Sequence, residues 1–94
     1  MSDINISVAY VGDDILAICH EFEEEYAFIA TFDKKAGEYF SRMQDTKGLM
    51  TSGRFKSVVD GRQMVMIALS KHMEAREHHE RLEQDEVKVN EALH

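Results

Sequence analysis

The sequence predicts an α+β fold, in which an N-terminal β-hairpin packs on a helix and is followed by a long C-terminal coiled-coil helix. Three observations lead to this prediction: period-two alternation over residues 4–10, apolar spacings of three and four over 22–43, and heptad spacing from 60 to the end. A chain of 94 residues has the length of one domain with a small core. We divide it into a head, residues 1–59, and an oligomerisation helix, residues 60–94.

The predicted hairpin opens the chain. Its first strand places apolar side chains on one face at a period of two: Ile4, Ile6, Val8 and Tyr10. Gly12, Asp13 and Asp14 supply turn chemistry, because Gly accepts positive φ and Asp can hydrogen-bond its own backbone. The second strand, residues 15–19, follows directly. An isolated hairpin is marginal in water, so this one must pack on a helix or join a larger sheet.

The next prediction is a helix over residues 21–47. One face carries apolar side chains at steps of three and four: Phe22, Tyr26, Ile29, Phe32, Ala36, Phe40 and Met43. Acidic residues lead this segment and basic residues close it, which suits the helix dipole. Gly48 is the expected C-terminal stop, and a loop follows over 48–57.

The long C-terminal helix begins with Asp60 as its N-cap, which leaves Gly61 at the first helical position. Two series spaced seven apart form an a/d seam that predicts the oligomer interface: Val65, Ala68, His72, Ala75, His79, Leu82, Val89 and Leu93. Its outer half cannot fold alone, so a homodimer or tetramer is expected. The seam histidines either fix the register or destabilise the dimer on protonation.

Composition and charge exclude several classes of function. The chain holds 18 acidic and 11 basic residues, a formal charge of −7, which disfavours nucleic acid and an anionic membrane surface as partners. The longest apolar run, residues 64–69, is too short to span a bilayer, and the N-terminus lacks a secretory signal pattern. A single cysteine, Cys19, suits a reducing compartment, so the expected location is cytoplasmic.

No arrangement of chemistry-bearing residues predicts an enzyme. His72, His78 and His79 lack the spacing of zinc-protease or di-iron motifs, so no metal site and no cofactor are expected. Cys19 adjoins His20, but neighbouring residues in a strand point to opposite faces. Phosphate-loop and nucleophile motifs are missing from the sequence.

Cations cluster between the two predicted helices. The residues we assign to partner binding are Arg42, Lys47, Arg54 and Lys56. In a chain of net charge −7 such a basic patch is either ordinary dipole complementation and solvated loop charge or a docking surface for an acidic protein partner.

The order of these features resembles the ZapA family of Z-ring-associated bacterial cell-division proteins. The matching stretches are residues 8–12, 18–19, 21–25, 42–47 and 64–69, and together the resemblance covers roughly 4–76. The chain departs from the family at His20, where Pro is usual, and at Asp13, where a basic residue is common.

The resemblance implies a non-enzymatic, oligomeric adaptor that crosslinks filaments of the tubulin-like division GTPase. Of the family's basic head residues, Arg42 and Lys47 have counterparts here. Weakly binding heads would gain avidity through oligomerisation. The alternative left open is a small acidic inhibitor or decoy, chromosomal or phage-encoded, that blocks a host protein with its acidic helix.

Overall fold

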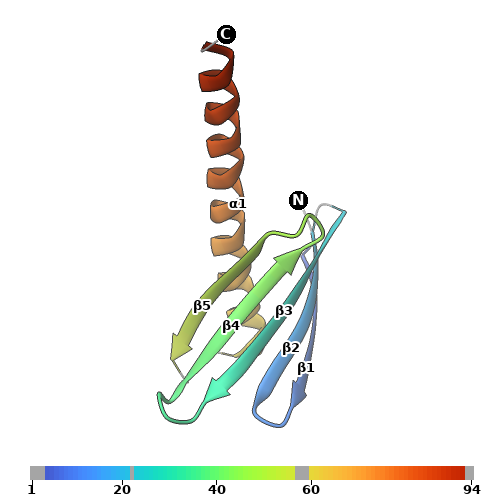
Figure 1. Cartoon of the computed structure of the whole chain (residues 1–94). Coiled ribbons are helices and arrows are strands. Elements are labelled where there is room, and N and C mark those ends of the chain that lie inside the picture. Colours follow the sequence, from blue (N-terminus) through green and yellow to red (C-terminus); the bar gives the residue numbers. More distant parts are fainter. Residues whose placement is uncertain (1–3, 22, 57–59, 93–94) are drawn as a thin grey trace.

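A five-stranded antiparallel sheet and one helix make up the fold (Figure 1). The structure is a computed structural model that describes residues 4–21, 23–56 and 60–92, with the helix side chains described up to Leu82. The elements are β1 (Asn5–Val11), β2 (Asp14–Glu21), β3 (Glu24–Asp33), β4 (Glu38–Asp45), β5 (Met50–Lys56) and α1 (Gly61–Ala92). Each strand pairs with the next in chain order, and α1 crosses behind the sheet and extends beyond it.

The N-terminal hairpin confirms the sequence prediction. β1 and β2 pair antiparallel from Asn5↔His20 to Val11↔Asp14, with Gly12 and Asp13 as the connecting loop. Gly12 has φ 62°, a left-handed conformation that glycine adopts without steric cost. The hairpin is stabilised by joining a larger sheet, since β2 also pairs with β3.

The predicted helix over residues 21–47 is wrong, and with it the predicted fold class. This segment forms β3 and β4, which pair antiparallel from Tyr26↔Asp45 to Asp33↔Glu38. β3 is the central strand and is apolar on both faces, because Tyr26, Phe28 and Ala30 are buried while Ala27 and Ile29 lie on the other side. A strand apolar on both faces also places apolar residues three and four apart, which imitates a helical stripe.

The two hairpin loops on either side of β4 are built alike, each around an aspartate. Asp33 Oδ1 accepts hydrogen bonds from the N–H groups two and three residues ahead, at 3.1 and 3.3 Å. Asp45 Oδ1 accepts from those two and four residues ahead, at 2.9 and 3.1 Å. Aspartate favours such turns because its short side chain reaches its own following backbone.

Helix α1 begins at Gly61, as the sequence predicts, with a first backbone hydrogen bond from Met64 N to Asp60 O at 2.9 Å. The absence of a side chain at this point matters. A Cβ on Gly61 would lie 2.7 Å from Tyr10 Oη and 3.2 Å from Val8 Cγ1. Glycine therefore lets the helix start close against β1.

The first half of α1 covers one face of the sheet and completes the core. The buried apolar side chains are Ile15, Ala17, Cys19, Tyr26, Phe28, Ala30, Met43, Phe55, Met64, Val65, Ala68 and Leu69. Full burial of a side chain such as Met64 or Leu69 contributes about 1.5–3 kcal/mol. The packing of these residues against strands, rather than against a second helix, fixes where α1 lies.

The predicted coiled coil is therefore also wrong. The seam residues Val65, Ala68 and His72 are buried against the sheet of their own chain, so they are unavailable to a partner helix. Farther along α1, Ala75 is half-buried and Leu82 is exposed. The last two seam positions lie outside the described side chains.

His72 joins α1 to the end of β4 and the start of β5 through buried polar contacts. Its Nε2 lies 2.9 Å from Asp45 Oδ2, and its Nδ1 lies 2.7 Å from Thr51 Oγ1. His72 is fully buried and Asp45 is 6% exposed. Because an ionised carboxylate only accepts hydrogen bonds, the imidazole Nε2–H donates to Asp45. One aspartate thus orders a loop and holds the helix.

We expect Asp45→Ala to lower the free energy of unfolding by about 2–4 kcal/mol, because it leaves a buried histidine without its carboxylate partner. Asp33→Ala is the matched control, since Asp33 orders the preceding loop in the same way but does not contact α1. Urea unfolding followed by circular dichroism measures both. Equal losses in the two variants would contradict the role assigned to the His72 contact.

Candidate functional site

The Thr51–His72–Asp45 arrangement contains the residue types of a hydroxyl–imidazole–carboxylate catalytic triad. Its position argues against catalysis. The cavity beside Thr51 has a volume of about 10 Å³, which is close to the minimum for one water molecule and far too small for a substrate. The three groups use their hydrogen-bonding capacity on one another and on the loop. We assign them a structural role.

The charge state of Asp45 follows from its surroundings. Burial by itself raises the pKa of Asp45, but the hydrogen bond from His72 and those from the backbone N–H groups of Leu49 and Lys47 outweigh it. The net pKa lies below the ordinary value, so the carboxylate is ionised at neutral pH. The anchor between α1 and the loop is therefore a charge-assisted contact.

A second polar cluster ties α1 to the start of β3. Arg76 donates through both terminal nitrogens to the Glu24 carboxylate, with Nη2 2.7 Å from Oε1, and Tyr26 Oη donates to Glu24 Oε2 at 2.8 Å. Lys47 Nζ lies 3.8 Å from Glu24 Oε1. The hydrogen bond from Arg76, followed by that from Tyr26, lowers the pKa of Glu24 to about 2. Burial, with the bond to Glu24, raises the pKa of Tyr26 to about 12.

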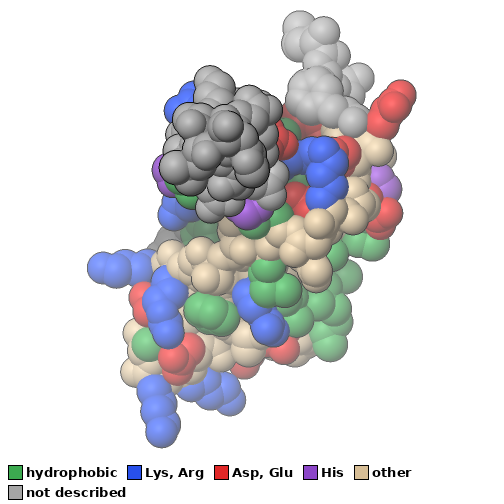
Figure 2. Space-filling view, turned by 45° about the horizontal axis from the view of Figure 1, so that its top comes forward, with side chains coloured by type: hydrophobic (Ala, Val, Ile, Leu, Met, Phe, Trp, Pro, Cys, Tyr) green, Lys and Arg blue, Asp and Glu red, His purple; other side chains and the backbone are tan. Residues whose placement is uncertain are grey.

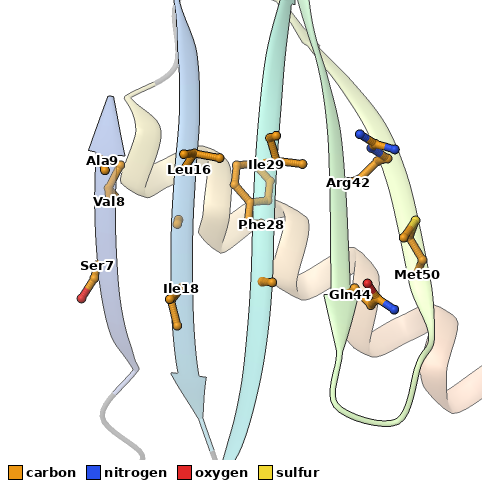
Figure 3. Close-up of a pocket in the computed structure, with 12 residues that line it drawn as sticks. Ser7, Val8, Ala9, Leu16, Ile18, Phe28, Ile29, Arg42, Gln44 and Met50 are labelled. Atoms are coloured by element: carbon orange, nitrogen blue, oxygen red, sulfur yellow. The ribbon is translucent and has the colours of Figure 1, made fainter. Parts of the chain in front are cut away.

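The candidate site lies on the opposite side of the sheet. We call the sheet face that α1 does not cover the outer face. Its apolar side chains include Ala9 of β1 and, from strands β2–β5, Leu16, Ile18, Ala27, Ile29, Phe40 and Met50. Leu16, Ile18 and Met50 are 39%, 44% and 51% exposed. They border a shallow hollow of about 650 Å³, shown in Figure 3, to which all five strands contribute lining residues.

Arg42 is the cation of this hollow. It projects from β4 beside Gln44 and near Met50, and it pairs across the strands with Ile29 (Figure 3). Among the described residues Arg42 has no ion-pair or hydrogen-bond partner. In the space-filling view, hydrophobic side chains gather on the β1–β3 side of the molecule and Lys and Arg side chains on the β4–β5 side (Figure 2).

The other predicted partner-binding residues divide between two places. Arg54 and Lys56 share the outer face with Arg42, because they alternate with the buried Phe55 along β5. Arg54 pairs with Glu38 at 3.0 Å. Lys47 instead lies in the β4–β5 loop, next to Glu24 at the end of the sheet. The structure thus places three of the four residues on one surface and separates the fourth.

The prediction of a helix over residues 21–47 concealed the apolar part of the outer face. A usable signal was present in β3. Its residues are apolar at both odd and even positions, which is typical of a strand covered on both faces. Only one cover, α1, is found among the described residues, so the other apolar face is left open.

Other parts of the described surface provide weaker support for a functional site than the outer face does. Within the described residues, no three His, Cys, Asp or Glu side chains are grouped as a metal site, and no helix is long and apolar enough to cross a membrane. The acidic side of α1, on which the decoy alternative depends, is partly neutralised. Glu77 pairs with Arg81 at 2.7 Å and Glu80 with Arg76 at 3.6 Å.

The Glu24–Arg76 contact predicts an acid-dependent stability. The pKa of Glu24 is about 2 in the folded protein and near 4.3 in the unfolded chain. The ionised carboxylate therefore makes its full contribution to the free energy of unfolding above pH 4.3. This contribution is lost as the pH falls toward 2. We expect Glu24→Gln to reduce the slope of unfolding free energy against pH over this range. In a protein that already carries Arg76→Met, adding Glu24→Gln should change this slope little, because the guanidinium that lowers the pKa of Glu24 is gone. An unchanged slope in Glu24→Gln alone would contradict the assignment.

Comparisons of the chain with protein-family models, with curated proteins and with solved structures gave no match. The resemblance to the ZapA family, the division role and the filament partner therefore stay predictions.

Proposed function

We propose that the protein is a non-enzymatic interaction module that docks an apolar, acidic segment of a partner protein on the outer face of its sheet. The observation that carries this proposal is Arg42, a cation without an ion-pair partner among the described residues, set in an apolar hollow. Apolar surface and an unpaired cation side by side match a segment that combines apolar side chains with a carboxylate.

Apolar burial and a contact between Arg42 and a carboxylate would hold such a segment. Leu16, Ile18 and Met50 gain by leaving water, at about 25 cal/mol for each Å² buried. Arg42 can bind a carboxylate through two parallel hydrogen bonds, which strengthen when the surrounding apolar contacts exclude water. The apolar contacts supply affinity, and the arginine selects an acidic partner over a basic one.

The shape of the surface favours a polypeptide. The hollow is open and extends across all five strands, whereas small-molecule sites enclose most of their ligand. A net charge of −7 opposes nucleic acid, so the acidic group is best supplied by protein side chains. We place the protein in the cytoplasm as part of this proposal, since Cys19 is a buried free thiol.

An anionic hydrophobic dye tests the chemistry of the face directly. Anilinonaphthalene sulfonate combines an apolar ring system with one negative charge, and the folded protein should bind it in a fluorescence titration. Arg42→Glu should weaken this binding by about fivefold or more, because it replaces attraction by repulsion. Arg62→Glu, the same charge change at an exposed position of α1, should leave it unchanged. Equal effects of the two variants would contradict a specific role for Arg42.

The filament implied by the ZapA resemblance is the first named partner to test. If filaments of the tubulin-like division GTPase dock on the outer face, Arg42→Glu should remove the protein from the pellet in a co-sedimentation assay. Lys47→Glu should still pellet, because Lys47 lies beside Glu24 away from that face. Failure of the wild-type protein to pellet would reject this partner, while the dye titration still tests the surface.

A further inference from the structure

The two edges of the sheet differ in how well they are protected. Each edge strand, β1 or β5, leaves one row of backbone N–H and C=O groups unpaired within the described structure, since β1 pairs only with β2 and β5 only with β4. β5 carries Arg54 and Lys56, and charges of this kind keep an edge from pairing with another chain. β1 has the sequence NISVAYV, with no charge and no proline.

We propose that β1 is a self-association edge, at which a second copy of the chain adds its own β1 antiparallel. Figure 1 shows β1 at the free margin of the sheet. Pairing of two identical strands about a two-fold axis perpendicular to the sheet is isologous, so it closes at a dimer. The result is one continuous sheet of two copies. This inference is independent of the proposed docking function.

The register with the longest overlap is self-complementary. Centred on the middle residue of β1, it sets Val8 opposite Val8, and Ser7 of one copy opposite Ala9 of the other. Ile6 then faces Tyr10 of the other copy, a β-branched residue against an aromatic one, which is a favourable cross-strand pair. Every pair in this register is uncharged, so none repels.

The exposed apolar side chains at the end of β1 also favour an interface at this edge. Tyr10 is 62% exposed and Val11 is 58% exposed, high fractions for large apolar side chains. Pairing of two β1 strands brings Ile6 of the second copy beside Tyr10. The two-fold axis also leaves both outer faces on the same side of the joined sheet. A dimer would then present two docking surfaces to one partner assembly and bind it with avidity.

The test measures the oligomeric state of the full chain by sedimentation equilibrium. The wild-type protein should dimerise. Ser7→Lys combined with Ala9→Lys sets lysine opposite lysine twice in the proposed register, and should raise the dimer dissociation constant about tenfold or more. Ser7→Lys combined with Ala9→Glu alters the same two exposed positions but sets opposite charges against each other, and should keep the dimer.

Each further outcome decides against the inference. A wild-type chain that remains monomeric up to millimolar concentration overturns it, as does equal dimerisation of both double variants. Disruption by Leu82→Lys, with both β1 variants still dimeric, would place the interface on α1 instead. Circular dichroism of each variant establishes that the chain is folded. Amide hydrogen exchange should slow in β1 as the wild-type concentration rises, a change that a helix-mediated dimer would not produce.

Discussion

The packing of α1 against one face of the sheet completes the core and decides which face stays uncovered. A five-stranded sheet with apolar residues on both faces needs cover, and the described residues supply one helix. Met64, Val65 and Leu69 fill the space between helix and strands and complete the core. Because that helix can cover only one face, the outer face remains open with its apolar side chains in place.

Two polar anchors fix α1 on the sheet along its length. His72 is held by Asp45 at the end of β4, and one turn farther on Arg76 is held by Glu24 at the start of β3. Both carboxylates have pKa values below the ordinary range because their hydrogen bonds favour the charged form. Apolar packing provides most of the stabilisation, while these pairs select one placement of the helix. The C-terminal part of α1 extends beyond the sheet (Figure 1).

The open face and the open edge follow from the same constraint. The described part of the chain contains no second helix that could cover the outer face, and a simple meander leaves each edge strand unpaired along one side. Charged residues protect the β5 edge and also border the apolar hollow, so Arg42, Arg54 and Lys56 give that side a basic character. Strand β1, by contrast, carries no charged residue. Because of this asymmetry, we propose an acidic segment as the partner of the outer face and a second copy of the chain as the partner of the β1 edge.

Two local elements follow from the amino-acid sequence alone. The sequence predicted the β1–β2 hairpin with its Gly12 turn and the start of α1 at Gly61, because both depend on neighbouring residues: alternation, turn chemistry and capping. It failed over residues 21–47, where the apolar pattern fits a helix and a doubly covered strand equally well. The choice between them depends on strand pairing, because β3 satisfies its backbone groups by hydrogen bonds to β2 and β4 and not by bonds within its own segment. His72 is likewise buried between α1 and the sheet and does not lie on a coiled-coil seam as predicted, because the helix packs against the strands of its own chain.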